Sequence, residues 1–213
     1  MPAPRAGAKL DRWGYPFMFS RFTALLLTTA LLLVPAPLLA DDNAALIERM
    51  RDGGLVIYWR HTLTDRSQRD SDLSDMDRCE TQRNLNGPGR EQARGVGAAF
   101  ERHGIPVGTV LASTFCRNRD TAELAFGRYE AVDDLFNLPA VGDPARREWL
   151  VTSLRERLAT PPADASLNTV IVGHNLNLRA AANVFIDEGG IALFEPLGGS
   201  RFRHLGSLRP EDL

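Results

Sequence analysis

The chain has 213 residues, 44% hydrophobic and 24% charged, which is the composition of a globular protein with room for one ordinary domain. Beyond residue 40, 21 basic residues, all of them arginine, stand against 26 acidic ones, a formal charge of −5. This charge balance argues against general nucleic-acid binding, which needs an excess of basic residues. It is compatible with a local arginine cluster that binds one small anion.

Residues 1–40 have the pattern of a secretory signal peptide. Basic residues precede an apolar run over residues 22–40, prolines interrupt that run, and Ala40 is a small residue at the expected cleavage point. Cleavage there predicts a periplasmic or secreted protein that begins at Asp41. The alternative is an uncleaved anchor, because about 20 apolar residues can cross a bilayer, and a membrane partner is expected only in that case.

Segments with the pattern of strands alternate with segments that have the pattern of helices over residues 41–213. The expected strands are residues 55–59, 107–112, 129–132, 169–173, 191–195 and 202–208. The expected helices are residues 44–53, 88–103, 121–126, 145–158 and 178–185. This alternation predicts a single α/β domain, a three-layer α/β/α sandwich around a mostly parallel sheet with an antiparallel edge strand.

A polar segment over residues 62–86 has no periodic apolar face and is too long for a simple turn, which indicates a functional loop. Cys79 lies in this loop, and the only other cysteine is Cys116. We expect a disulfide between them, because an exported protein meets an oxidising compartment. Such a bond would hold residues 82–84 beside Arg117. Two unrelated thiols are the alternative.

Charged and polar side chains follow three of the expected strands. Arg60 and His61 end the first strand, residues 113–117 follow the second, and His174 follows the strand at 169–173. Ligands of such sheets bind at the carboxyl ends of the strands, so these side chains should share one rim. Imidazole can attack phosphorus, and guanidinium groups match phosphoryl oxygens, so the rim suits phosphate chemistry that needs no metal ion or other cofactor.

The same segments resemble the motifs of the histidine phosphatase superfamily, which has the phosphoglycerate mutase fold. Residues 55–62 (LVIYWRHT) are similar to its arginine–histidine signature. Residues 113–117 (STFCR), followed by Thr121 and Ala122, are similar to its second-arginine motif, and residues 170–175 (VIVGHN) to its second-histidine motif. The resemblance extends from Leu55 to about Leu208, and the three motifs together are specific.

The resemblance implies a phosphomonoester hydrolase in which His61 becomes phosphorylated and water then releases phosphate. The residues expected to form the pocket that holds the phosphoryl group or the substrate are Arg60, Thr62, Arg117, His174 and Asn175. At Thr62 the family most often has glycine, so the loop that follows is expected to fold less freely against the substrate.

The sequence departs from the mutase branch at Asn137, where that branch would have its acidic proton donor, so mutase activity is not expected. An alkyl phosphate still needs an acid to protonate its leaving oxygen. Glu188 is the first candidate and Asp65 the second. If neither serves, phosphohistidine or an aryl ester becomes the more plausible substrate, because those leaving groups depart more easily.

The expected partner is a phosphorylated small molecule or envelope component. A binding module is the alternative function, in which the same rim captures such a ligand without turnover. Among the remaining charged residues, Arg119 is expected on an exposed helix face. Arg66 and Arg69 are expected in solvent, and the alternative is that they contact the non-reacting part of a substrate. We assign no function to His103 or His204.

Overall fold

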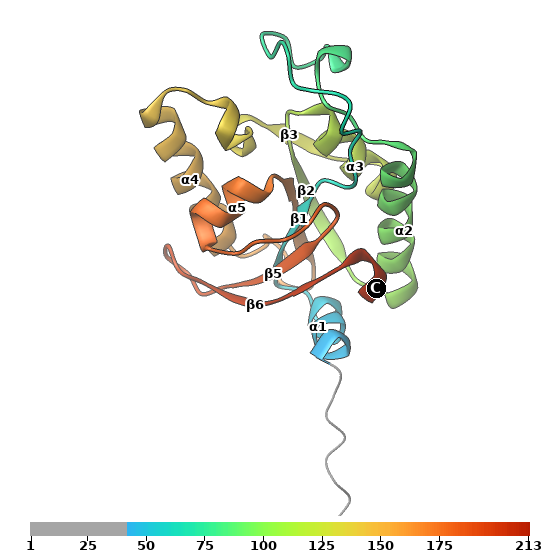
Figure 1. Ribbon diagram of the computed structural model, residues 1–213. Coiled ribbons are helices and arrows are strands. Elements are labelled where there is room, and N and C mark those ends of the chain that lie inside the picture. The colour runs from blue at the N-terminus through green and yellow to red at the C-terminus, as the bar shows by residue number, and fades with distance from the viewer. Residues whose placement is uncertain (1–41) are drawn as a thin grey trace, which may run out of the picture. The chain divides into compact units, whose positions relative to one another are not determined.

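The computed structural model describes residues 42–213, so the expected signal peptide and its cleavage point at Ala40 lie outside the described residues. The described residues form one six-stranded sheet in the order β3-β2-β4-β1-β5-β6 (Figure 1). The strands are β1 (Val56–Arg60), β2 (Val107–Ser113), β3 (Glu130–Val132), β4 (Asn168–Gly173), β5 (Ile191–Pro196) and β6 (Phe202–Leu208). The first four are parallel, and β5 and β6 are each antiparallel to the neighbour that precedes them in the sheet.

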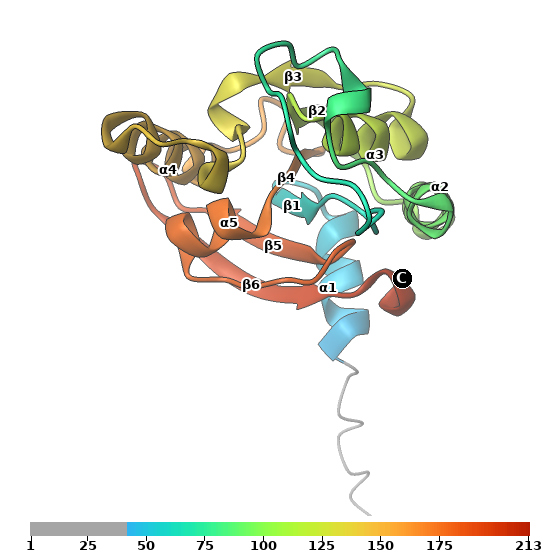
Figure 2. The same ribbon diagram turned by 45° about the horizontal axis from the view of Figure 1, so that its top comes forward.

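Helices cover both faces of this sheet, which confirms the three-layer α/β/α class (Figure 2). The helices are α1 (Asp42–Arg51), α2 (Gly87–His103), α3 (Cys116–Phe126), α4 (Pro144–Ala159) and α5 (Asn175–Ala182). The first three contribute to the core on one face, and α4 and α5 to the core on the other. No helix within residues 42–213 has both the length and the apolar character needed to cross a membrane.

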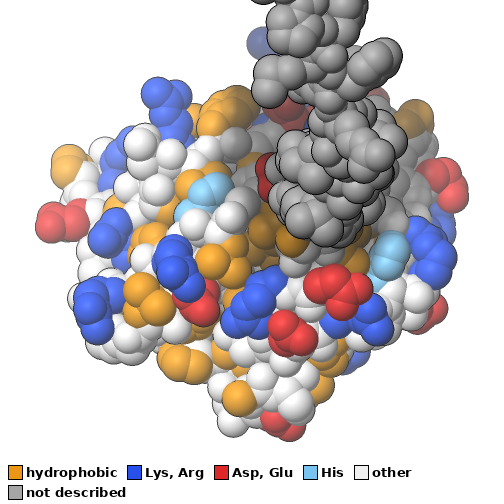
Figure 3. Space-filling view, turned by 90° about the horizontal axis from the view of Figure 1, so that it is seen from below, with side chains coloured by type: hydrophobic (Ala, Val, Ile, Leu, Met, Phe, Trp, Pro, Cys, Tyr) orange, Lys and Arg blue, Asp and Glu red, His pale blue; other side chains and the backbone are white. Residues whose placement is uncertain are grey.

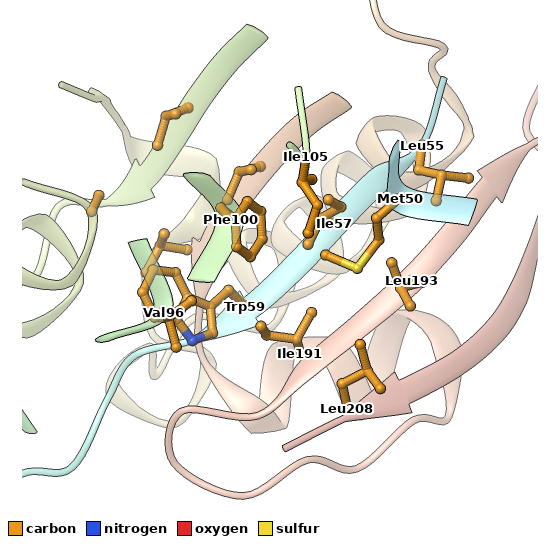
Figure 4. Packing of buried hydrophobic residues seen from close by; sticks show 14 of the residues in the cluster. Met50, Leu55, Ile57, Trp59, Val96, Phe100, Ile105, Ile191, Leu193 and Leu208 are labelled. Carbon is orange, nitrogen blue, oxygen red and sulfur yellow. The ribbon is translucent and has the colours of Figure 1, made fainter. Parts of the chain in front are cut away.

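The side chains of β1 alternate between the two cores, as expected for a strand buried on both faces. Ile57 and Trp59 lie in one cluster with Phe100 of α2 (Figure 4). Tyr58 lies in the other cluster with Leu178 of α5. Burying one large apolar side chain stabilises a fold by about 1.5–3 kcal/mol, so this packing fixes the strand and the residues that follow it.

Helices α3 and α5 differ most from the bounds that the sequence predicts. Helix α3 begins at Cys116, five residues before the expected start at 121, because Phe115 provides an extended N-cap and the polar residues after it are buried rather than solvated. Helix α5 ends at Ala182 rather than 185, because Asn183 adopts a left-handed conformation with φ of 55°. Both differences arise at polar residues, which are buried in α3 and end the helix in α5. A pattern of hydrophobic residues does not detect either effect.

Figure 3 shows the underside of the molecule as it is drawn in Figure 1. Arginine and acidic side chains are interspersed over the visible part of this face. The residues expected to carry chemistry lie at the opposite end, where β1, β2 and β4 finish beneath the loop of residues 62–86 (Figure 1).

Candidate active site

The strand register brings the two expected histidines together. Strands β1 and β4 are adjacent and parallel, with Arg60 opposite Gly173, so His61 and His174 leave the sheet side by side. The backbone N–H of His61 donates to the carbonyl oxygen of Gly173 over 3.1 Å, a normal hydrogen-bond length. The two imidazole ring centres are 5.6 Å apart.

The His61 ring is held in one tautomer. Its Nδ1 atom lies 3.0 Å from the carbonyl oxygen of Thr62. A carbonyl oxygen only accepts, so Nδ1 carries the proton and Nε2 keeps its lone pair. Burial, followed by the positive charges of Arg117 and Arg60, lowers the pKa of His61 well below its ordinary value of 6.5. The ring is therefore neutral at pH 7, the form that a nucleophile requires.

His174 is fixed on three sides. Its Nε2 atom lies 2.9 Å from the hydroxyl oxygen of Ser113, and its ring meets the edge of Phe115 with centres 5.0 Å apart. Its carbonyl oxygen accepts a hydrogen bond of 2.9 Å from the Tyr58 hydroxyl. Burial and the charge of Arg117 lower the pKa of this imidazole well below 6.5 as well.

Arg117 enters the site from the first turn of α3 and its side chain is only 1% exposed. Its guanidinium lies over the ring of Phe115, 4.4 Å from the ring centre. The Nη1 and Nη2 atoms donate to the two carboxylate oxygens of Asp70 over 2.9 and 3.3 Å, and Nη1 also donates to the carbonyl oxygen of Arg83 over 3.2 Å. Burial lowers the pKa of Arg117, an effect that the Asp70 charge opposes.

Glu188 lies between two further guanidinium groups. Its Oε1 atom is 3.7 Å from Nη2 of Arg60 and 3.8 Å from Nη2 of Arg83, and it accepts a hydrogen bond of 2.8 Å from the Thr64 hydroxyl. The Nε atoms of Arg60, Arg83 and Arg117 are buried without a hydrogen-bond partner. Three cationic groups with unused donors around two neutral imidazoles make an anion-binding arrangement.

Asp65, the second candidate for a proton donor, belongs to a local turn instead. Its carboxylate accepts from the hydroxyl and the backbone N–H of Ser67 over 2.7 and 2.9 Å. These hydrogen bonds lower the pKa of Asp65 and hold its carboxylate in the turn.

The side chains of Thr62 and Asn175 make contacts within the fold. The Thr62 hydroxyl lies 3.3 Å from that of Thr121 on α3, and the Asn175 side-chain oxygen accepts from the backbone N–H of Ile186 over 3.2 Å. Thr62 is fully buried, whereas Asn175 is partly exposed. Both residues adjoin the histidines, and in this structure each supports the backbone beside them.

The expected disulfide between Cys79 and Cys116 is present, with Cα atoms 5.7 Å apart. It attaches the 62–86 loop to the residue before Arg117. The expectation that Arg119 lies on an exposed face is wrong, because the attached loop covers that face. The Arg119 side chain is 19% exposed, and its Nη2 atom lies 3.1 Å from the Cys116 sulfur.

Sequence reasoning gave no role to Asp70, placed Arg83 beside Arg117 only through the expected disulfide, and named Ser113 and Phe115 only as members of a motif. The first two lie in the loop, where no periodicity indicates which side chains turn inward. The available signal was the pairing of Cys79 with Cys116, which requires the loop to fold over the start of α3. Ser113 and Phe115 belong to the second-arginine motif, and their contacts with His174 depend on the sheet order.

No protein-family model and no curated protein sequence matches the chain. Solved structures share its fold. The protein histidine phosphatase SixA, complexed with tungstate, is 14% identical with a TM-score of 0.54, over 74% of this chain and 98% of that chain. The mycobacterial glucosyl-3-phosphoglycerate phosphatase Rv2419c is 14% identical with a TM-score of 0.50, over 71% and 97%. A third structure, TTHB049 from Thermus thermophilus, is 18% identical with a TM-score of 0.50, over 72% and 98%. The described residues therefore have the histidine phosphatase fold.

Proposed function

We propose that the protein is a phosphomonoester hydrolase that works through a phosphohistidine on His61. The observation that carries the proposal is a neutral His61 with a free Nε2 lone pair, among Arg60, Arg117 and His174. Hydrolysis by two phosphatases of the same fold supports the reaction class.

In the first step, Nε2 of His61 attacks phosphorus, the new P–N bond forms and the bond to the leaving oxygen breaks. The guanidinium groups of Arg60 and Arg117, with His174, stabilise the charge that spreads over the phosphoryl oxygens. Glu188 donates a proton to the leaving oxygen when the substrate is an alkyl phosphate. In the second step, water attacks phosphorus and the P–N bond breaks, which gives orthophosphate and neutral His61. When the substrate is an alkyl phosphate, Glu188 takes a proton from this water and so regains the proton that it gave to the leaving oxygen.

The role of Glu188 predicts a difference between substrates. An aryl phosphate has a good leaving group and needs little protonation, whereas an alkyl phosphate needs it strongly. Glu188→Gln should therefore lower kcat more for glycerol phosphate than for p-nitrophenyl phosphate. An equal loss on both would instead assign Glu188 to the orientation of Arg60 and Arg83.

We also propose that the protein acts in the periplasm or outside the cell, on a phosphorylated small molecule or envelope component. The apolar run over residues 22–40 and the disulfide between Cys79 and Cys116 support this location. N-terminal sequencing of the soluble and membrane fractions tests it. A chain that begins at Asp41 supports cleavage, and an intact N-terminus in the membrane fraction supports the anchor.

The activity test uses p-nitrophenyl phosphate with the purified protein, with and without EDTA. Turnover should survive EDTA, because the proposed mechanism uses no metal ion, and it should be lost in His61→Ala and strongly reduced in His174→Ala. His204→Ala is the matched control, because His204 is an exposed histidine on β6. Phosphate binding without turnover of aryl, sugar or histidine phosphates would favour the binding module.

A further inference from the structure

The carboxylate of Asp70, in the 62–86 loop, is paired with the Arg117 guanidinium to which a phosphoryl group would bind. Both oxygens of Asp70 pair with Arg117, and its Oδ1 atom also accepts from the backbone N–H of Arg83 over 3.0 Å. The Arg117 side chain is 1% exposed and that of Asp70 is 23% exposed, so the pair extends from the interior to the surface.

This pairing lies in a site whose two histidines are buried. His61 and His174 are 2% and 3% exposed, so both imidazoles lie deep in the site. A carboxylate and a phosphoryl group present oxygens to guanidinium in a similar fork, and therefore compete for the same Nη atoms.

The loop is anchored on both sides of Asp70. Before it, the backbone N–H of Asp65 donates to the carbonyl oxygen of Asn84 over 2.9 Å, and the Gln68 side chain accepts from the backbone N–H of Asn84 over 2.9 Å. Beyond it, the disulfide joins Cys79 to Cys116, and the Gln82 side chain accepts from the backbone N–H of Cys116 over 2.9 Å. Residues 66–71 are exposed. The Asp70 side chain can therefore turn away from Arg117 while the anchors on both sides, with the disulfide, keep the loop beside α3.

We propose that Asp70 is an internal competitor for the phosphoryl position and selects against weak anions. This inference rests on the proposed role of Arg117 in phosphate binding. A carboxylate ligand that displaces Asp70 from Arg117 forms the same kind of ion pair as the one that it breaks. It therefore gains little binding free energy from the exchange. A phosphoryl dianion brings more charge and a third oxygen for the unused Nε donors, so it displaces Asp70.

The opposite role for Asp70 is to orient Arg117 for substrate. The two roles predict opposite effects of Asp70→Asn, which keeps the shape of the side chain and removes its charge. Loss of a competitor tightens phosphate binding, whereas loss of an orienting partner weakens it.

The test is isothermal titration of inorganic phosphate, and separately of acetate, into the full chain in a low-salt buffer without other oxyanions. Asp70→Asn should bind phosphate about tenfold more tightly than the wild type, which corresponds to about 1.4 kcal/mol, and should gain measurable affinity for acetate. Asp70→Ser serves as a second variant if Asp70→Asn does not fold, as judged by circular dichroism.

Asp72→Asn is the matched control, because Asp72 lies in the same loop and pairs with Ser74 and Arg78. It should bind phosphate as the wild type does. Unchanged or weaker phosphate binding in the Asp70 variants overturns the competitor role, while binding by the wild type still upholds the proposed function. Failure of every form, wild type included, to bind phosphate overturns both.

Discussion

The Tyr58 hydroxyl donates a hydrogen bond of 2.9 Å to the carbonyl oxygen of His174, although Tyr58 belongs to β1 and His174 follows β4. Burial raises the pKa of Tyr58 far above its ordinary value of 10, so the hydroxyl remains a donor at any physiological pH. The carbonyl oxygen also accepts from the backbone N–H of Leu178 over 3.2 Å in α5. The carbonyl oxygen of His174 thus links β1, which precedes His61, to α5, which follows His174.

Tyr58→Phe should lower the free energy of unfolding by about 1 kcal/mol, because one buried hydrogen bond is lost while the carbonyl oxygen keeps its second donor. Urea unfolding measures this loss. Tyr129→Phe is the control, because Tyr129 is 37% exposed, and it should leave stability unchanged. Equal effects from both substitutions would contradict the structural role of the Tyr58 hydroxyl.

Gly173→Ala should destabilise the protein by about 1–3 kcal/mol and reduce activity, because overpacking a filled interior forces neighbours to move. A Cβ at this position would lie 2.1 Å from the Tyr58 hydroxyl oxygen. Gly95→Ala is the matched control, since Gly95 is exposed in α2 with open space around its Cβ position. Thermal unfolding should show that the control is stabilised by about 0.5–1 kcal/mol. A stable, active Gly173→Ala protein would refute the account of this contact.

The strands and the order of the motifs were predictable from the sequence, because β1 and β4 are continuous apolar runs with charged or polar ends. The contacts of His61 depended on sheet order and register, which place Arg60 beside Gly173. The position of Asp70 on Arg117 was not predictable, because an irregular loop has no repeating pattern that fixes the direction of a side chain. The sequence offers one constraint on where that loop lies, the pairing of Cys79 with Cys116.

Replacing both cysteines, Cys79→Ser with Cys116→Ser, should lower the free energy of unfolding by about 3 to 4 kcal/mol, because the bond closes a loop with a sequence separation of 37 residues. Phosphate binding should also weaken, because Arg117 follows Cys116 directly. Urea unfolding and phosphate titration measure the two effects. Dithiothreitol should reproduce both in the wild type and change neither in the double variant. A wild type that contains two free thiols would contradict this prediction.

Stability should fall as the pH is lowered below about 6.5, the value for histidine in an unfolded chain. The folded-state pKa values of His61 and His174 lie well below it, so the unfolded chain binds protons first. The loss should continue down to the folded-state pKa values. Urea unfolding from neutral pH to about pH 5 measures the slope.

His61→Gln should have a shallower pH dependence than the wild type over this range. His204, whose pKa burial also lowers, contributes to the slope in both proteins and cancels in the comparison. An identical slope in the two proteins would mean that His61 is not held in its neutral form by the fold.

The most direct test of the mechanism is the chemical identity of the intermediate. The protein is mixed with p-nitrophenyl phosphate, quenched in alkali and digested for mass spectrometry, because a phosphohistidine survives alkali and is hydrolysed by acid. We expect the added mass of one phosphoryl group on His61 and none in His61→Ala. A phosphoryl group on another residue, or turnover that persists in His61→Ala, would contradict it.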